Sequence, residues 1–370
     1  MTKNMIFLLI MTLLMSCGDG KEKNRSGPRD TPPMSARSHD IHIFYHAGFG
    51  TPEIDGEYRS WNSEGENKMG ESLSYPGGMD IASSFFPAYG CYSSNDPRVI
   101  ESHMGQLAVA QTGVVCVLWY GKDSYESRPV QMILDTAVRY SIRVDFMIAA
   151  YEGRTIESVA GDIRHIIDTW GKHEAFYITD RSGMLPMFFI EQTWSFETEV
   201  WASILSEKGT GTIRNTPFDA ILIGGWEDSG DGDRVLDAGF DGFYTPYSSA
   251  ETWGADVTNW EEMNLFAMDN TLIFIPTLRP GYDDTRIHSW NGGAVIDRDV
   301  GEFYMTMVKA ALKLKPPYIS LDSFNHWQAG TQIEPAAPLK LQEFEYKNYR
   351  DENGYRYLRV TKEWVKGFSR

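Results

Sequence analysis

Short runs of β-branched and aromatic residues alternate with longer segments of helical period along this chain, and this alternation limits its fold more than any other feature. The pattern is typical of a parallel sheet whose strands are connected by helices. The candidate strands are residues 41–45, 113–119, 143–149, 185–190, 220–224, 242–244, 272–277 and 318–323. The candidate helices are residues 97–111, 129–140, 158–170, 199–207, 260–269, 302–314 and 357–368.

This alternation predicts an α/β fold, a single-domain (β/α)₈ TIM barrel, which we expect to occupy residues 41–370. An open doubly wound sheet would have fewer strands and usually a glycine-rich first turn. No G-x-G-x-x-G pattern follows the first candidate strand. With 370 residues, 42% of them hydrophobic, the chain is long enough to bury one large core.

The first 40 residues differ in composition and predict export and membrane anchoring. Lys3 precedes an apolar run, and Leu14-Met15-Ser16-Cys17 resembles a bacterial lipobox. The run is shorter than the ~20 apolar residues that a membrane-spanning helix needs. We expect residues 1–17 to be a lipoprotein signal peptide with lipid attached at Cys17, and the polar residues 18–40 to be a flexible tether. An ordinary cleaved signal peptide is the alternative.

These features predict a bacterial lipoprotein that is periplasmic or anchored at the outer membrane or cell surface. The formal charge of −17 would repel phosphate backbones and anionic lipid surfaces, and the sequence contains no basic patch. We therefore expect no nucleic-acid partner and no membrane contact except through the lipid anchor. Neutral glycans remain acceptable partners.

The sequence carries no recognisable metal or nucleotide motif. H-E-x-x-H, C-x-x-C and P-loop patterns are absent, and the acidic segment 227–233 lacks the order of a calcium loop, so we interpret it as a solvated loop. Besides Cys17, only Cys91 and Cys116 are present, too few for a disulfide framework. Cys116 lies in an apolar run and is expected to be buried. We expect no metal ion and no cofactor.

In a TIM barrel, the residues at the C-terminal ends of the strands and in the loops that follow line the active site. Here those positions are rich in aromatic, carboxylate and amide side chains, which bind sugar rings and hydroxyls. For any single tryptophan a packing role is about as common, so the clustering is what indicates a site. The predicted substrate-binding residues are Tyr45, Trp61, Trp119, Tyr120, Tyr151, Gln192, Trp226, Glu227, Tyr244, Tyr282, Asn325, Trp327, Gln328 and Glu334.

One segment identifies a family. Residues 319–335, ISLDSFNHWQAGTQIEP, resemble the active-site segment of glycoside hydrolase family 99, the endo-α-1,2-mannosidase family, whose usual pattern here is S-F-N-E-W-H-E-G-T-Q-I-E. Further blocks resembling the family follow its order at residues 80–87, 90–104, 238–245 and 280–291. The resemblance implies a (β/α)₈ barrel and a glycan substrate, with α-mannan as the family's example.

Both catalytic glutamates that the resemblance implies are replaced, the first by His326 and the second by Ala329. In the family, the first would remove a proton from the sugar's 2-hydroxyl, so that this oxygen forms an epoxide with the anomeric carbon. The second would serve as acid and base for the leaving group. Other departures from the family pattern are Gly48 at a tryptophan, Ala149 at a glutamate, Glu152 at an often basic position, Gln192 at an aspartate and Pro246 at a tyrosine.

Two functions therefore remain open: a glycoside hydrolase with a rearranged active site, and a catalytically inactive glycan-binding pseudoenzyme. Hydrolysis generally needs two carboxyl groups, and Asp322, Glu191 and Glu227 are the candidates. His326 could accept a proton, because imidazole titrates near neutral pH. We assign catalysis to His326, Asp322 and Glu191, although each acid could instead be a hydrogen-bonded or solvated group. The retained carboxylates favour the hydrolase narrowly.

Overall fold

The structure is a computed structural model that describes residues 38–66, 72–181, 183–246, 252–288 and 295–368. The predicted signal peptide, Cys17 and the tether as far as residue 37 lie outside these ranges. The first strand begins at Ser38, so residues 38–40, which we had assigned to the tether, belong to the barrel. Among the described residues, no helix combines the length and the apolar character that crossing a membrane requires.

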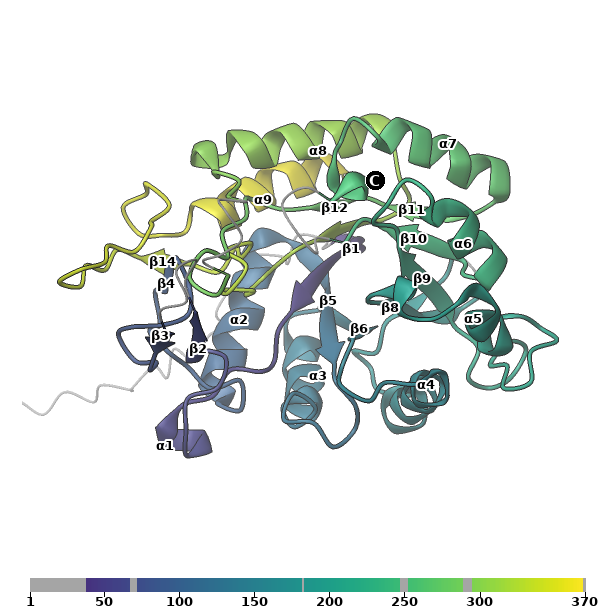
Figure 1. Ribbon diagram of the computed structural model, residues 1–370, viewed down its shortest axis with the longest axis horizontal. Helices are drawn as coiled ribbons and strands as arrows, with labels where there is room; N and C mark the ends of the chain where they lie inside the picture. The colour runs from purple at the N-terminus through teal and green to yellow at the C-terminus, as the bar shows by residue number, and fades with distance from the viewer. Residues whose placement is uncertain (1–37, 67–71, 182, 247–251, 289–294, 369–370) are drawn as a thin grey trace, which may run out of the picture. The chain divides into compact units, whose positions relative to one another are not determined.

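Parallel strands form the centre of the fold, in the neighbour order β11-β10-β9-β8-β6-β5-β1-β13-β12. β11 and β12 are the first and last strands of this order, but they are consecutive in the chain. The sheet therefore closes on itself (Figure 1), which confirms the predicted barrel. The strands are β1 (Ser38–Tyr45), β5 (Thr112–Trp119), β6 (Arg143–Ile148), β8 (Leu185–Ile190), β9 (Ile221–Gly225), β10 (Gly242–Tyr244), β11 (Ile273–Ile275), β12 (Thr277–Leu278) and β13 (Ile319–Leu321).

The predicted seventh strand, residues 272–277, is interrupted at Pro276. Proline has no backbone N–H to donate to a ladder, which explains the break. β11 pairs with β10 on one side, and β12 pairs with β13 on the other. The Pro276 carbonyl still accepts a hydrogen bond from the backbone N–H of Ser320 at 3.1 Å. The two short strands thus complete the barrel as one interrupted strand.

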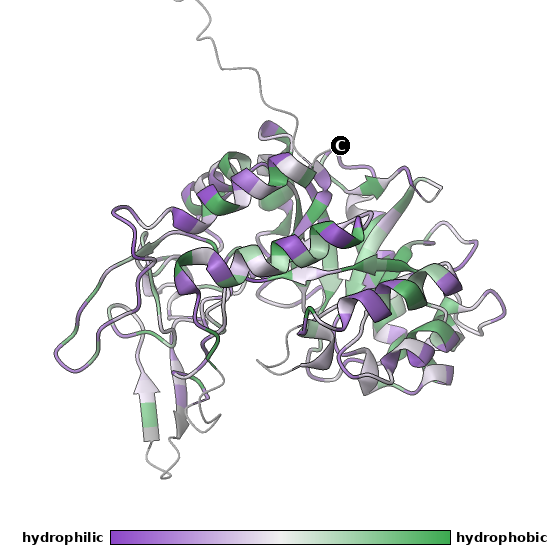
Figure 2. Ribbon diagram, turned by 90° about the horizontal axis from the view of Figure 1, so that it is seen from above, coloured by the Kyte–Doolittle hydropathy of each residue, from purple (hydrophilic) through white to green (hydrophobic). Residues whose placement is uncertain are grey.

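Helices surround the barrel (Figure 1). They are α2 (Pro97–Ala110), α3 (Val130–Arg139), α4 (Ile156–Trp170), α5 (Thr198–Leu205), α6 (Asp231–Ala238), α7 (Trp260–Asn270), α8 (Glu302–Leu314) and α9 (Arg356–Phe368). Figure 2 shows hydrophobic strands in the centre and helices that alternate between hydrophilic and hydrophobic residues. Helix α6 was not predicted. Its acidic first turn, which we had interpreted as part of a solvated loop, is favourable at a helix N-terminus.

Alternate residues of each strand face opposite sides, and this parity divides the core in two. In β5, Val115, Val117 and Trp119 pack against the helices. Val114, Cys116 and Leu118 pack inside the barrel with side chains of the other strands. Cys116 is fully buried, as expected.

Shorter elements lie outside the barrel. They are α1 (Pro52–Asp55), the hairpin of β2 (Ser63–Glu66) and β3 (Ser72–Tyr75), the pair of β4 (Phe86–Pro87) and β14 (Ala336–Ala337), and β7 (Ile178–Thr179), which pairs with β8. The antiparallel pairing of β4 with β14 joins the long connection after β1 to the segment after β13. These two segments carry residues that form the site described next.

Candidate active site

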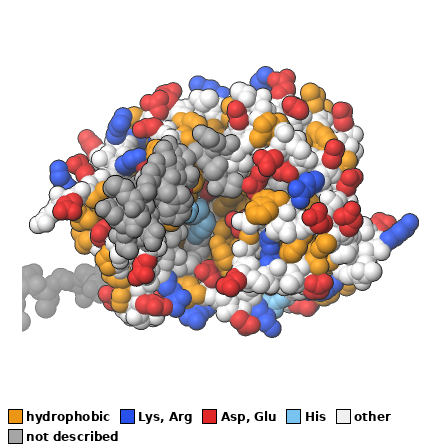
Figure 3. Space-filling model, viewed as in Figure 1, with side chains coloured by type: hydrophobic (Ala, Val, Ile, Leu, Met, Phe, Trp, Pro, Cys, Tyr) orange, Lys and Arg blue, Asp and Glu red, His pale blue; other side chains and the backbone are white. Residues whose placement is uncertain are grey.

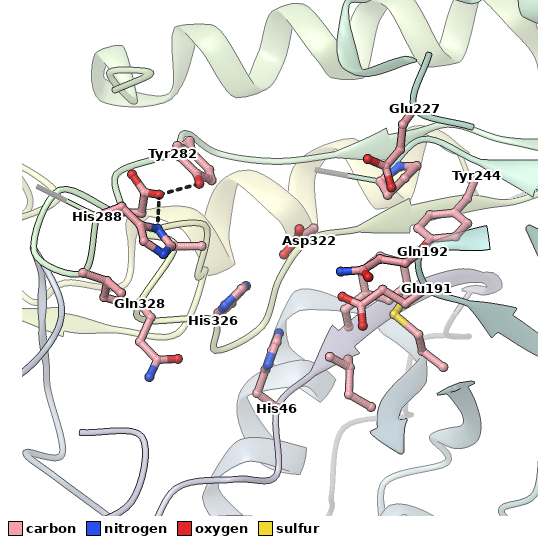
Figure 4. A pocket seen from close by; sticks show the side chains of 17 residues that line it. His46, Glu191, Gln192, Glu227, Tyr244, Tyr282, His288, Asp322, His326 and Gln328 are labelled. Carbon is pink, nitrogen blue, oxygen red and sulfur yellow. Dashed lines mark hydrogen bonds and ion pairs between the residues drawn. The ribbon is translucent and has the colours of Figure 1, made fainter. Parts of the chain in front are cut away.

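A cavity of about 420 Å³ lies where the barrel strands end. Figure 3 shows a hollow on this face of the molecule with a histidine side chain on its wall. Figure 4 shows how the polar side chains, contributed by several strand ends, are arranged around the cavity. The lining residues are Phe44, His46, Leu118, Met147, Glu191, Gln192, Glu227, Tyr244, Pro246, Tyr282, Asp284, Ile287, His288, Asp322, His326, Gln328 and Ala329.

The three residues that we assigned to catalysis, Asp322, Glu191 and His326, all line this cavity. Asp322 follows β13, and its Oδ1 accepts a hydrogen bond from the Thr331 hydroxyl at 2.9 Å. Burial raises the pKa of the Asp322 carboxyl, and the nearby His326 only partly opposes this effect. Glu191 follows β8, and its Oε2 accepts a hydrogen bond from the backbone N–H of Ala150 at 2.8 Å.

His326 forms an imidazole pair with His46, which directly follows β1. The two rings stack with their centroids 4.1 Å apart and their planes 26° from parallel. Asn325 fixes His46, because its side chain accepts from the His46 N–H at 2.8 Å and donates to the His46 carbonyl at 2.9 Å. The Ser323 hydroxyl accepts from the backbone N–H of His326 at 2.7 Å.

Both imidazoles are held in their neutral form. Burial lowers the pKa of His326, against the opposing effects of Asp322 and Glu191. Burial also moves the pKa of His46 well below its usual value, and the neighbouring His326 adds to this effect. Each ring therefore has a lower proton affinity in the folded protein than in the unfolded chain.

We expect this histidine pair to make stability depend on pH. A histidine whose folded pKa lies below the unfolded value of 6.5 gives full stability above that pH and loses it as the pH falls towards the folded pKa. The free energy of unfolding should fall below pH 6.5 by at most ~1.4 kcal/mol per pH unit for each ring. Urea unfolding between pH 8 and pH 5 measures this change.

The control for this prediction is the variant that carries both His46→Gln and His326→Gln. It should show a flatter pH dependence between about pH 7 and pH 5 than the wild type. The variant His173→Gln, whose ring lies at the surface 3.0 Å from Asp135, should keep the wild-type slope. An unchanged slope in the double variant would show that the buried rings are not the source.

The opposite part of the cavity wall comes from the loop after β12. The Tyr282 hydroxyl donates to Asp284 Oδ2 at 2.8 Å, and His288 Nδ1 lies 2.7 Å from the same oxygen. Sequence reasoning missed His46, Asp284 and His288. His46 directly follows the first predicted strand, and Asp284 and His288 have the i, i+4 spacing that brings side chains together on a helical turn. Those two signals could have identified them.

The structure brings some of the predicted substrate-binding residues together and separates others from the cavity. Gln192, Glu227, Tyr244, Tyr282 and Gln328 line it. Burial, together with Glu191 and Glu227, raises the pKa of Tyr244 well above its usual value, so the phenol remains a hydrogen-bond donor. The residues that do not line the cavity are Tyr45, Trp61, Trp119, Tyr120, Tyr151, Trp226, Asn325, Trp327 and Glu334.

Strand parity explains several of these placements. Trp119 ends β5 on its helix-facing side and packs against Trp170 of α4. Trp226, just after β9, packs against Phe243 and Phe266. The Tyr151 hydroxyl donates to Asp162 of α4 at 2.6 Å and lies 2.8 Å from the Ser158 hydroxyl, so this ring is turned towards the helix layer. Tyr120 packs against the apolar cluster inside the barrel.

The model of glycosyl hydrolase family 99 matches residues 37–370. This chain belongs to glycosyl hydrolase family 99. A human glycoprotein endo-alpha-1,2-mannosidase-like protein is 39% identical over 91% of this chain and 78% of its own length. Mouse glycoprotein endo-alpha-1,2-mannosidase is 36% identical over 92% of this chain and 77% of its own length.

A solved structure of the family confirms both the predicted family and the predicted fold. It is the family 99 endo-alpha-mannosidase from Bacteroides thetaiotaomicron, which matches with a TM-score of 0.84 and 36% sequence identity. The match covers 90% of this chain and 98% of that one. This chain is thus a glycoside hydrolase family member, similar to endo-alpha-mannosidases, with a (β/α)₈ barrel.

Two residues retained from the family 99 motif, Trp327 and Glu334, belong to a buried cluster that does not line the cavity. Glu334, 1% exposed, accepts from the Tyr92 hydroxyl at 2.7 Å and from Trp327 Nε1 at 2.8 Å. Its other oxygen lies 3.1 Å from His103 Nε2, and His103 Nδ1 lies 2.9 Å from the Tyr45 hydroxyl. We infer that Glu334, Trp327 and Tyr45 hold the segment that resembles the family's active-site motif in place through these contacts.

The described ranges contain no group of three or more His, Cys, Asp or Glu side chains placed to hold a metal ion. The polar groups that line this family 99 cavity are carboxylates, imidazoles, phenols and amides. Together they can donate protons, accept protons and bind hydroxyls.

Proposed function

We propose that this chain is a secreted glycoside hydrolase that cleaves a polysaccharide or oligosaccharide with a rearranged set of acids. The observation that carries the proposal is Asp322, a carboxyl group in the cavity whose pKa burial has raised. A raised pKa keeps more of the carboxyl protonated, as protonation of a departing glycosidic oxygen requires.

In this proposal Asp322 is the general acid. Glu191, held by the backbone N–H of Ala150, is the second carboxylate and stabilises the positive charge that develops on the sugar ring. An imidazole accepts the proton of the attacking nucleophile. Gln192, Glu227 and Gln328 bind sugar hydroxyls, and Gln328 is oriented by its hydrogen bond to the Ser60 carbonyl at 2.9 Å.

The relatives' names make an α-linked mannan the first substrate to test. The human and mouse proteins are described as endo-alpha-1,2-mannosidase-like and endo-alpha-1,2-mannosidase. Two cavity positions that depart from the family pattern, Gln192 and Pro246, favour a glycan other than α-1,2-mannan. The panel of substrates therefore has to be wider than mannans.

A glycan-binding pseudoenzyme is the second candidate. It is supported by Ala329, which stands where the resemblance places the family's acid and base, and which presents only a methyl group to the cavity. A protein of this kind would keep the barrel and the sugar-binding wall without turnover.

A screen of the wild-type protein separates the two candidates. The panel contains yeast α-mannan, neutral glucans and galactans, pectin, sulfated polysaccharides and chitosan, and each is assayed for binding by affinity electrophoresis and for new reducing ends. The hydrolase predicts reducing ends from at least one polysaccharide. Binding without product on every polysaccharide that binds would establish the pseudoenzyme. If the protein neither bound nor cleaved any polysaccharide of the panel, both candidates would be contradicted.

We also propose that the protein is a bacterial lipoprotein, periplasmic or at the cell surface, anchored through Cys17. The lipobox-like Leu14-Met15-Ser16-Cys17 supports this. In a bacterial host, Cys17→Ala should move nearly all of the protein from the membrane fraction to the soluble fraction, because the lipid is lost. Cys91→Ala is the matched control and should leave it with the membranes. Retention of the Cys17→Ala variant in the membrane fraction would contradict the anchor.

A further inference from the structure

An imidazole and a carboxylate form a close pair in the cavity wall, and sequence reasoning did not predict this pair. His288 Nδ1 lies 2.7 Å from Asp284 Oδ2, and the Tyr282 hydroxyl donates to the same oxygen at 2.8 Å (Figure 4). Asp284 is 3% exposed, whereas the His288 side chain is 45% exposed. A buried carboxylate thus holds a ring that opens onto the cavity.

This geometry suits proton transfer. When Nδ1–H donates to a carboxylate, the ring has a defined tautomer in which Nε2, on the opposite edge, is the nitrogen that takes up a proton. The carboxylate then stabilises the imidazolium that forms. Burial, together with Asp284, raises the pKa of Tyr282, so this phenol stays protonated and continues to donate to Asp284.

His326, our sequence-based candidate for the proton acceptor, is less suited to that role. Burial lowers its pKa, and its ring stacks on the equally neutral His46. Within the described ranges, no carboxylate is hydrogen-bonded to the His326 ring, so no partner fixes its tautomer. Among the residues that the structure describes, the Asp284–His288 pair is the one in which a cavity imidazole has a carboxylate at hydrogen-bond distance.

We propose that His288, positioned by Asp284, is the general base that activates water in this reaction; the inference rests on the proposed hydrolase function. A water oxygen attacks the anomeric carbon while its proton passes to His288 Nε2. The glycosidic C–O bond breaks, its electron pair goes to the leaving oxygen, and that oxygen takes the proton of the Asp322 carboxyl. His288 then loses a proton to solvent, and Asp322 regains one. A single displacement by water inverts the anomeric configuration.

The test measures kcat and KM against pH for the full-length protein, on the panel polysaccharide that yields the most reducing ends. His288→Gln should lower kcat by about 10² to 10⁴-fold with little change in KM, and should remove the acidic limb of the pH profile. In Asp284→Asn, a positioning variant, the imidazolium loses its stabilising charge, so the acidic limb should move to lower pH. Added imidazole should restore part of the activity of His288→Ala.

Two controls isolate the pair. His173→Gln alters a surface histidine whose Nε2 lies 3.0 Å from Asp135, and it should keep the wild-type kcat and profile. His326→Gln should keep the acidic limb, because it leaves His288 and Asp284 unchanged. The other titratable groups that line the cavity also stay as they are: His46, Glu191, Glu227, Tyr244, Tyr282 and Asp322. Loss of that limb in His326→Gln but not in His288→Gln would overturn the proposal.

Different results would contradict His288 as the general base and the hydrolase function itself. A wild-type rate in His288→Gln on a polysaccharide that the protein cleaves would overturn the base and leave the hydrolase standing. Absence of product from the whole panel would overturn both. Nitrogen NMR of the histidine rings adds a readout without substrate: the Nδ1–H tautomer of His288 should be present in the wild type and diminished in Asp284→Asn. Equal tautomer populations in the two would overturn the orienting role of Asp284.

Discussion

Asp322→Asn should lower kcat by about 10² to 10⁴-fold on any polysaccharide that the wild type cleaves, because the variant has no proton to give to the leaving oxygen. KM should change little, since the amide keeps the size of the carboxyl group and its oxygen can still accept from the Thr331 hydroxyl. A general acid works only while protonated, so wild-type activity should fall as the pH rises through the raised pKa of Asp322. Asp322→Asn should lack this basic limb.

The matched control is Glu152→Gln, which removes an exposed acid from the loop after β6. It should keep activity close to that of the wild type. If Asp322→Asn also kept more than about half of the wild-type kcat, Asp322 would not be the general acid. Glu191→Gln and Glu227→Gln would then be the next variants to measure.

Glu334→Leu should lower the free energy of unfolding by about 3 to 5 kcal/mol, the usual range for removing one partner of a buried charged cluster. The leucine has no acceptor for the buried Tyr92 hydroxyl, and it leaves Trp327 Nε1 only the longer hydrogen bond to the Tyr92 oxygen at 3.2 Å. An unpaired buried donor loses its hydrogen bonds to water without replacement. Urea unfolding followed by tryptophan fluorescence measures the change.

Two further variants accompany it. Glu334→Gln keeps an acceptor oxygen and should lose clearly less stability than Glu334→Leu. Glu343→Leu, at an exposed position, should change the free energy of unfolding by no more than ~0.5 kcal/mol. A loss below 1 kcal/mol in Glu334→Leu would contradict the view that this cluster holds the active-site segment.

The barrel could be predicted because its strands are buried on both sides. Such strands appear in the sequence as short, nearly continuous apolar runs, and β5 and β8 are clear examples. Pro276 shows the limit of this reasoning, because the run from 272 to 277 reads as one strand although its proline cannot donate to the ladder. Helix α6 was missed because three of its eight residues are aspartates.

The candidate site was predictable where a polar residue directly follows a strand. Glu191 and Asp322 follow β8 and β13, and both line the cavity. Position after a strand does not give the direction of a side chain, so Trp119 and Trp226 were assigned to the substrate although they pack among the helices. A shift of one residue along a strand moves the side chain to the other face of the sheet.

A residue that matches the family motif can either contact substrate or pack in the core, and the sequence does not show which. Trp327 and Glu334 match the family pattern, yet both are buried, neither lines the cavity, and the two are hydrogen-bonded to each other. Their types are required by the packing of the segment, which positions Asp322 and His326. Asp284 and His288 lie in a loop and not at the end of a strand. The expectation that residues at strand ends line the site therefore did not apply to them.

The most direct test of the account is the anomeric configuration of the first product. Proton NMR during hydrolysis of the most readily cleaved polysaccharide follows the new reducing end before mutarotation equilibrates it. If Asp322 acts as acid and an imidazole activates water, the product first appears with the configuration opposite to that of the cleaved bond, and Asp322→Asn yields almost none of it. Initial retention of configuration would contradict direct attack by water, and a polysaccharide that binds but never yields a reducing end would contradict the hydrolase itself.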